Sequence, residues 1–397
     1  MNNSQTTTHK PRRNISLALG GLVVAGIVGA GFAPNTASAS VTRPSARGHT
    51  ASLQADLDAM VEAGAPGALL LVRDGHHTTH LTSGLGEIAT GTPMRPDDHF
   101  KIASLTKTYT ATVVLQLVAE HKLSLNDNVE QWLPGLVPNG ENITVRQLLS
   151  HTSGLFDYEA DPRFLEPYFS GDLGFYWPPR DLVGLAVSHD PLFPPGQTPI
   201  AVYSNTNYVL AGLIVEAVTG RSIGDEFQTR LFDPLHLDET VYPTEPVLPD
   251  PYAHGYMVIG GPPALDVTGL SPSMTSSAGG LVSTTDDVAD FYRALLSGRL
   301  LPKNLLRQME TTRSEGTKVD IPGQEYGLGL ETFPTSCGVA WGHNGVVPGY
   351  FTFIFSSKDG QRQAILMVNH DAQTLPEPVG PMFFELVAKA FCSTSHR

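Results

Sequence analysis

The stretch Ser104-Leu105-Thr106-Lys107 stands just ahead of an apolar helical pattern that runs from Val113 to Val118. A serine on the first turn of a buried helix lies near unpaired N–H groups and the positive end of the helix dipole. A residue three positions later lies on the same helix face, so the Lys107 amine can reach the Ser104 hydroxyl. The amine can take the hydroxyl proton only if burial or a neighbouring cation lowers its pKa toward neutrality.

Two further polar stretches lie far along the chain. Tyr203-Ser204-Asn205 comes directly before a second apolar helical pattern, and His343-Asn344-Gly345 comes shortly before the strand-like run from Tyr350 to Phe355. Taken singly, Tyr203 fits a core tyrosine and His343 fits a histidine at the edge of a strand. The order of the three stretches is what argues for a catalytic site.

Together the three stretches resemble the motifs of the penicillin-binding and serine beta-lactamase superfamily. The resemblance is closest to the Tyr-Ser-Asn branch, which holds class C beta-lactamases, secreted D-alanyl-D-alanine carboxypeptidases, D-aminopeptidases and certain esterases. It covers nearly all of the chain after residue 50. Further stretches similar to the secreted carboxypeptidases are Ala65-Pro66-Gly67-Ala68, Leu148–Leu155, Tyr326–Leu330 and the placement of Cys337 and Cys392.

The resemblance implies a role for each motif residue. Ser104 would attack a carbonyl and form an acyl-enzyme, with Lys107 as proton acceptor and Tyr203 as partner in proton relay. Asn205 would donate a hydrogen bond to Lys107 or to a substrate amide. The backbone N–H groups of Ser104 and Val346 would form the oxyanion hole. Whether Lys107 or Tyr203 is the base stays open at this point, because their titrations are coupled.

Two positions depart from the carboxypeptidase pattern. Asn344 stands where those enzymes have a threonine whose hydroxyl holds the substrate carboxylate, and an amide is bulkier. Glu331 stands where they have an arginine, and a glutamate would repel a terminal carboxylate. Both departures weaken the case for strict carboxypeptidase action and leave acyl transfer intact. The residues assigned to substrate binding are Asn205, Glu331, His343, Asn344, Gly345 and Val346.

The first 39 residues have the pattern of an export signal. A charged head ends at Arg13, an apolar glycine-rich stretch follows from Ile15 to Phe32, and Ala37-Ser38-Ala39 supplies small residues for cleavage. An uncleaved membrane anchor is the alternative, although the glycines weaken this stretch as a helix. We expect the protein to be exported by either the general secretory or the twin-arginine route and to be cleaved near Ala39.

Composition limits the partners and cofactors. The chain has 397 residues and a net charge of −14 with neutral histidine, which argues against nucleic acid as a partner. Cys337 and Cys392 are the only cysteines, and in an oxidising compartment we expect them to form a disulfide. Metal-binding motifs are absent from the sequence, so we expect no metal and no cofactor. We expect a monomer, although the sequence does not fix the oligomeric state.

Strand patterns at both ends of the chain enclose a helical middle. We expect residues 51–104 and 325–397 to share one antiparallel sheet flanked by helices, and residues 105–324 to form a largely helical inserted region. Residues 40–50 have the composition of a flexible leader. The expected fold class is α/β of the α+β type, with a single beta-lactamase/transpeptidase-like catalytic unit over residues 51–397.

These observations predict a secreted serine acyl-hydrolase. By resemblance, it is D-alanyl-D-alanine carboxypeptidase-like on peptidoglycan-type peptides and acylated by beta-lactams. An esterase, a D-aminopeptidase or a class C-like beta-lactamase is the alternative on the same fold. A non-catalytic penicillin-binding or scaffolding protein is a third possibility, and the intact Ser104, Lys107 and Tyr203 argue against it.

Overall fold

The computed structural model describes residues 46–258, 263–316, 321–376 and 379–393. The export signal predicted for residues 1–39 therefore lies outside the described residues. Helix α1 (Ala46–Glu62) begins inside the leader predicted for residues 40–50, so the end of that prediction is wrong. The helix continues into the apolar face of Leu53, Leu57 and Met60, whose burial stabilises its N-terminal turns as well.

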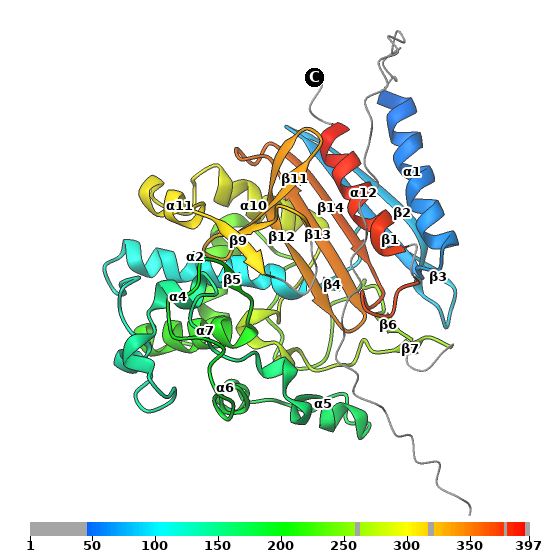
Figure 1. The fold of residues 1–397 in the computed structure, drawn as a ribbon. Helices are drawn as coiled ribbons and strands as arrows, with labels where there is room; N and C mark the ends of the chain where they lie inside the picture. The colour runs from blue at the N-terminus through cyan, green and yellow to red at the C-terminus, as the bar shows by residue number, and fades with distance from the viewer. Residues whose placement is uncertain (1–45, 259–262, 317–320, 377–378, 394–397) are drawn as a thin grey trace, which may run out of the picture. The chain divides into compact units, whose positions relative to one another are not determined.

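A large sheet forms the centre of the fold, with the strand order β3-β2-β1-β14-β13-β12-β11-β10-β9-β5 (Figure 1). β1 (Gly67–Asp74) and β2 (His77–Glu87) form a β-hairpin. β1 also pairs with β14 (Arg362–Val368). The two ends of the chain therefore share one sheet, as the sequence predicted. Among the described residues, the strand pairings of this sheet are antiparallel except that of β5 (Ala201–Val202) with β9 (Arg313–Gly316), which is parallel.

The other strands are shorter or lie between these. The large sheet also contains β3 (Thr92–Pro93), β10 (Glu325–Tyr326), β11 (Glu331–Thr335), β12 (Gly338–Val347) and β13 (Tyr350–Ser356). Two small pairs are formed by β4 (Phe100–Lys101) with β8 (Val282–Ser283) and by β6 (Tyr256–Met257) with β7 (Leu265–Asp266).

An apolar cluster lies on each face of the large sheet. Helices α1 and α12 (Val379–Ser393) pack on one face (Figure 1). Phe351 and Phe353 of β13 belong to the apolar cluster on that face. Because side chains alternate along a strand, Tyr350 and Ile354 of β13 face the other cluster, which the helical region covers. Full burial of each such side chain contributes about 1.5–3 kcal/mol.

The inserted region is mainly helical, as predicted. At its centre lie α2 (Thr106–Ala119) and α7 (Asn205–Thr219), which are buried on nearly every side. The remaining helices are α3 (Val129–Trp132), α4 (Val145–Leu149), α5 (Pro162–Phe169), α6 (Pro179–Val187), α8 (Ile223–Phe227), α9 (Asp233–Leu235), α10 (Thr285–Leu296) and α11 (Lys303–Met309). Among the described residues, no helix is long and apolar enough to cross a membrane.

The segment from Phe156 to Pro195 is rich in proline, which favours loops, and yet it contains α5 and α6. Both helices begin with a proline, whose fixed backbone angle suits the first helical turn. In α5, the Asp161 side chain also accepts a hydrogen bond from Arg163 N and so caps the helix. Prolines in the first turn are therefore compatible with both helices, and Pro167 lies further along, inside α5 itself.

Cys337 and Cys392 form the predicted disulfide, which joins the turn between β11 and β12 to α12. The bridge spans 55 residues, so in the chain-entropy model its loss lowers the free energy of unfolding by about 4 kcal/mol. We expect Cys392→Ser to shift the urea unfolding midpoint down by the corresponding amount. Adding reductant to the wild type should give the same shift, and an unchanged midpoint in both would contradict the prediction.

Candidate active site

Ser104 lies in a single 3-10 turn, η1 (Ala103–Leu105), between β4 and α2. Ala103 has φ 50, in the left-handed region that residues with side chains seldom adopt. Strained positions of this kind persist where the surrounding structure holds them, and they gather at functional turns. The turn leaves Ser104 partly exposed at the start of α2, as the sequence predicted.

Lys107 is fully buried, and its amine points at the nucleophile. Nζ donates hydrogen bonds to Ser104 Oγ at 2.9 Å, Asn205 Oδ1 at 2.7 Å and Ala278 O at 2.8 Å. Burial lowers the pKa of Lys107 to about 8, against the opposing effect of nearby carboxylates, of which Glu159 is the strongest. About a tenth of the amine is therefore neutral at pH 7 and able to accept a proton.

Tyr203 completes the contacts of the Ser104 hydroxyl. Its OH donates to Ser104 Oγ at 2.9 Å, and Lys107 Nζ lies 4.7 Å from the centre of its ring. Burial and then the charge of Glu331 raise the pKa of Tyr203 well above 10. The raised pKa favours the protonated form of Tyr203, and this makes Lys107 the better candidate for the base of the two that the sequence left open.

Asn205 accepts a hydrogen bond from Lys107, whereas the sequence predicted that it would donate one to Lys107 or to a substrate amide. Its Nδ2 donates to Asp157 Oδ2 at 3.3 Å, so the donor end of the amide is already occupied. Asp157 thereby orients Asn205 toward the amine. Sequence reasoning missed Asp157, because it lies just beyond the Leu148–Leu155 stretch and belongs to no motif.

The third motif brings β12 against the nucleophile turn. A Cβ on Gly345 would lie 2.4 Å from Ile102 O, so only glycine allows β12 to pack this closely beside η1. His343 is fully buried, with Nε2 3.3 Å from Tyr326 OH. Burial lowers the pKa of His343 to about 3, so its imidazole is neutral.

The remaining predicted substrate-binding residues are placed differently. Glu331 is 1% exposed and accepts a hydrogen bond from Asn344 N at 3.0 Å, so it lies inside the protein. Burial raises the pKa of Glu331 well above its ordinary value, which favours a protonated carboxyl. Along β12, Asn344 shares a face with Val346, which packs on the cluster under α12, whereas His343 and Gly345 share the opposite face. The Asn344 side chain thus stands apart from the hydrogen bonds around Ser104.

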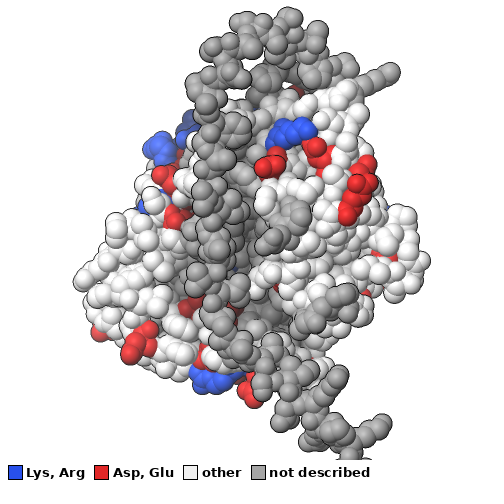
Figure 2. Space-filling view, turned by 45° about the vertical axis from the view of Figure 1, so that its right-hand side comes forward, with Lys and Arg blue, Asp and Glu red and all other residues white. Residues whose placement is uncertain are grey.

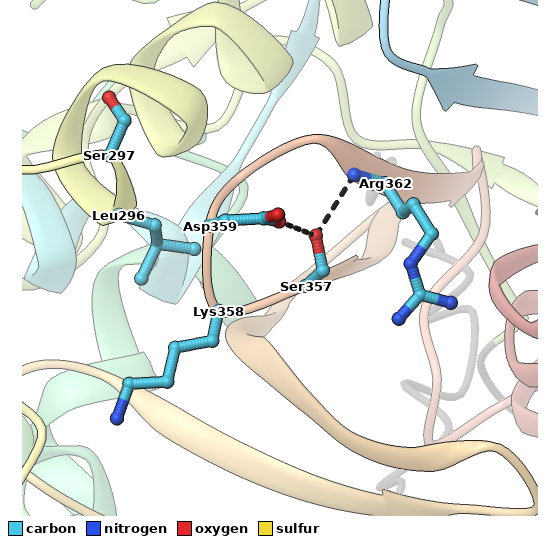
Figure 3. Close-up of a pocket in the computed structure, with 6 residues that line it drawn as sticks. All are labelled: Leu296, Ser297, Ser357, Lys358, Asp359 and Arg362. Atoms are coloured by element: carbon cyan, nitrogen blue, oxygen red, sulfur yellow. Dashed lines mark hydrogen bonds between the residues drawn. The ribbon is translucent and has the colours of Figure 1, made fainter. Parts of the chain in front are cut away.

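A separate hollow of about 610 Å³ lies beside the turn between β13 and β14. It is lined by Leu296, Ser297, Ser357, Lys358, Asp359 and Arg362. In Figure 3 the charged ends of Lys358 and Arg362 point apart. Asp359 Oδ1 accepts a hydrogen bond from Ser357 Oγ. None of these residues belongs to the group around Ser104, so this hollow is distinct from the candidate active site.

The surface carries mixed charge. On the face in Figure 2, the Lys and Arg side chains of the described residues stand in small groups next to Asp and Glu. Within the described ranges, no group of three or more His, Cys, Asp or Glu residues is placed to hold a metal ion.

Comparison with known proteins identifies the class. The beta-lactamase family profile matches residues 53–383. Penicillin-binding protein 4* of Bacillus subtilis (strain 168) is 29% identical over 334 residues, covering 78% of this chain and 69% of the relative. The chain therefore belongs to the beta-lactamase family, as the motifs predicted, and is a serine hydrolase of that family.

Two solved structures are also similar over almost their whole length. A D-stereospecific amidohydrolase from Streptomyces sp. has 38% sequence identity and a TM-score of 0.77, covering 86% of this chain and 98% of that one. D-amino acid amidase from Ochrobactrum anthropi SV3, complexed with D-phenylalanine, has 28% identity and a TM-score of 0.78, covering 88% and 99%. The predicted fold class is confirmed by these neighbours.

Proposed function

We propose that this hydrolase cleaves amide bonds of D-amino acid derivatives through an acyl-enzyme at Ser104. The observation that carries the proposal is the pair of contacts on one oxygen. Ser104 Oγ lies 2.9 Å from the Lys107 amine and 2.9 Å from the Tyr203 hydroxyl. A nucleophile, a base and a proton carrier thus meet in one place, as covalent acyl transfer requires.

In the acylation step, Ser104 Oγ forms a bond to the substrate carbonyl carbon and its proton moves to the neutral amine of Lys107. The carbonyl oxygen becomes an oxyanion, for which the N–H groups of Ser104 and Val346 are the proposed donors. Each such donor contributes about 3–4 kcal/mol at the transition state. The C–N bond then breaks, and the leaving amine takes a proton from Tyr203, which regains one from Lys107.

Deacylation repeats the same proton movements with water. A water molecule gives its proton to Lys107 and attacks the acyl carbon, and the Ser104 oxygen leaves with a proton returned through Tyr203. Free acid and the original hydroxyl result. Asn205 and Ala278 O hold the amine in place throughout, because both accept hydrogen bonds from Nζ.

The groups around the amine favour a substrate without a terminal carboxylate. Glu331 occupies the position of the carboxypeptidase arginine, and its buried carboxyl offers no positive charge to a substrate carboxylate. Glu159 and then Asp157 raise the pKa of Lys107 most strongly, and their negative charge disfavours a further anion near the amine. The names of the two structural neighbours support D-amino acid amides, while the penicillin-binding relative supports the second candidate, a D-alanyl-D-alanine carboxypeptidase that beta-lactams acylate.

A substrate series tests the proposal. We expect hydrolysis of D-phenylalanine amide, little of the L-enantiomer, and slower hydrolysis of an acylated D-Ala-D-Ala peptide. A nitrophenyl ester and nitrocefin complete the series. Faster cleavage of the D-Ala-D-Ala peptide would favour the carboxypeptidase, and turnover of the ester alone would exclude both candidates.

The pH dependence should follow Lys107. Burial lowers the pKa of this amine to about 8, and only its neutral form can act as base. We therefore expect kcat/KM for D-phenylalanine amide to rise with pH and to level off above a midpoint near 8. A profile that stays flat from pH 6 to 9 would remove Lys107 from the role of base.

We also propose that the protein acts outside the cytoplasm as a monomer. The support for export is the charged head, apolar stretch and Ala37-Ser38-Ala39 at the N-terminus. N-terminal sequencing of protein from the culture medium should begin just after Ala39. Retention of the intact N-terminus in the membrane fraction would favour an anchor, and sedimentation would give the oligomeric state.

A further inference from the structure

His151, in the Leu148–Leu155 stretch, has no part in the chemistry described so far, yet it lies beside the second motif. It is fully buried, and its backbone has φ 53. Few residues with side chains adopt this left-handed conformation, although His and Asn do so more readily than most. The surrounding structure holds the His151 backbone in a strained conformation, and strain of this kind often marks a functional position.

Three hydrogen bonds join His151 to the segment on both sides of Tyr203. Val202 N donates to the His151 carbonyl oxygen at 2.8 Å. Ser204 N donates to the imidazole Nδ1 at 3.2 Å, and Asn207 Nδ2 lies 3.0 Å from the same nitrogen. Because Nδ1 faces a backbone N–H, it is the acceptor nitrogen, and the ring proton belongs on Nε2.

The orientation of the Asn207 amide is fixed independently. Ser153 Oγ donates to Asn207 Oδ1 at 2.6 Å, so the oxygen of the amide faces Ser153 and the nitrogen faces His151. Ser153 belongs to the same stretch of chain as His151. The second hydrogen bond to His151 therefore comes from Asn207, and Ser153, two residues after His151, orients the amide that donates it.

Aromatic rings enclose the imidazole. Its centre lies 4.3 Å from that of Tyr203, 4.6 Å from that of Tyr326 and 5.3 Å from that of Tyr208. Tyr326 in turn lies edge-on to His343 of the third motif, at 5.7 Å. His151 thus stands between the second motif and the ring that contacts the third.

The charge state of His151 fits this position. Burial, followed by the positive charge of Lys107 and the neighbouring His343, holds the pKa of His151 well below 6.5. The imidazole is therefore neutral over the working range of the enzyme. Nε2 has no hydrogen-bond partner among the described residues. The imidazole is instead surrounded by the three tyrosine rings.

We propose that His151 is a positioning residue that holds the Tyr203 hydroxyl against Ser104, by clamping the backbone on either side of Tyr203 and packing on its ring. Among the described residues no hydrogen bond joins it to Ser104, and it takes no proton in the reaction. The inference rests on the proposed acyl transfer at Ser104. A neutral imidazole suits the task, because it accepts at Nδ1 without placing a second cation beside Lys107.

The test removes the two contributions of the His151 side chain, the Nδ1 acceptor and the ring, in separate variants. His151→Phe keeps a ring and removes the Nδ1 acceptor, whereas His151→Asn tolerates the backbone conformation and removes the ring. For each folded variant we expect acylation by labelled penicillin and kcat for D-phenylalanine amide to fall about tenfold to a hundredfold. KM should change less than threefold, because the substrate contacts remain.

A second readout separates positioning from general damage to the fold. Tyr203 covers Lys107 on one side, so a loosened Tyr203 admits water to the amine, and the midpoint of the kcat/KM profile should move above that of the wild type. The charged or titratable groups facing His151 are Lys107 and His343, together with the three tyrosines. A lower rate with an unchanged midpoint and a raised KM would overturn the proposal.

Matched controls are available at His121, which is exposed and has φ 57. His121→Phe and His121→Asn impose the same backbone demand away from the site, and both should acylate at the wild-type rate. Equal rates for His151 and His121 variants would overturn the inference while leaving the proposed function intact. Failure of the wild type to form any adduct would instead refute the proposed function.

A measurement on the wild type keeps the inference testable if the variants do not fold. In protein with ¹⁵N-labelled histidine, the His151 signals, assigned through Overhauser effects to Asn207, should show a neutral ring with the proton on Nε2 from pH 5 to 9. A ring that titrates in this range, or carries its proton on Nδ1, would overturn the proposed clamp.

Discussion

Ser104→Ala should abolish the covalent adduct with labelled penicillin and lower kcat for D-phenylalanine amide by about a millionfold, the size of loss seen when another serine hydrolase loses its nucleophile. The reason is that no other hydroxyl is activated in the same way. Ser104 Oγ alone is contacted by both the Lys107 amine and the Tyr203 hydroxyl in the described structure. Intact-protein mass spectrometry and steady-state rates measure the two effects.

Ser170→Ala is the matched control, because Ser170 is an exposed serine at the end of α5. It should take up the label and hydrolyse the amide at the wild-type rate. An adduct that persists in Ser104→Ala, located by peptide mapping at another residue, would show that the nucleophile has been misassigned.

Lys107→Met should slow acylation by at least about a hundredfold, the lower limit for losing a general base. Methionine keeps most of the side-chain volume, so the loss reports on the amine. Asn205 and Ala278 O lose their donor as well, and an unsatisfied buried acceptor costs about 1–3 kcal/mol of stability. The rate of adduct formation by folded protein, measured with excess labelled penicillin, separates the two consequences.

Lys101→Met provides the control for removing a buried lysine. Lys101 Nζ donates to Thr268 O at 2.9 Å and Leu270 O at 2.7 Å, and its burial lowers its pKa to about 7. This variant should lose stability in the same way but acylate at the wild-type rate per folded molecule. Equal acylation rates for Lys107→Met and the wild type would mean that another group takes the Ser104 proton.

The sequence predicted those parts of the site that depend on local spacing. The i, i+3 relation of Ser104 and Lys107 follows from helix geometry. The strand and helix patterns at both chain ends were also sufficient to predict one shared sheet. These features need only a short stretch of residues to be recognised.

Contacts between distant segments could not be predicted in this way. Ala278 O accepts from Lys107 through its backbone, and a backbone acceptor leaves no mark in the sequence. Asn205 was expected to donate to Lys107 or to a substrate amide, but it accepts from Lys107, because its Nδ2 donates to Asp157. Glu331 looked like a residue of the binding surface, yet its carboxyl is buried and accepts a hydrogen bond from Asn344 N.

The pairing of β1 with β14 sets when catalysis can begin. Ala68 lies opposite Val368, so the central sheet closes only when nearly the entire polypeptide has become available. Contacts of such long sequence separation form slowly, since much chain entropy is lost before they are made. A nascent chain that already carries Ser104 and Lys107 therefore has no working nucleophile, and a C-terminal truncation before β14 should yield an inert product at every length.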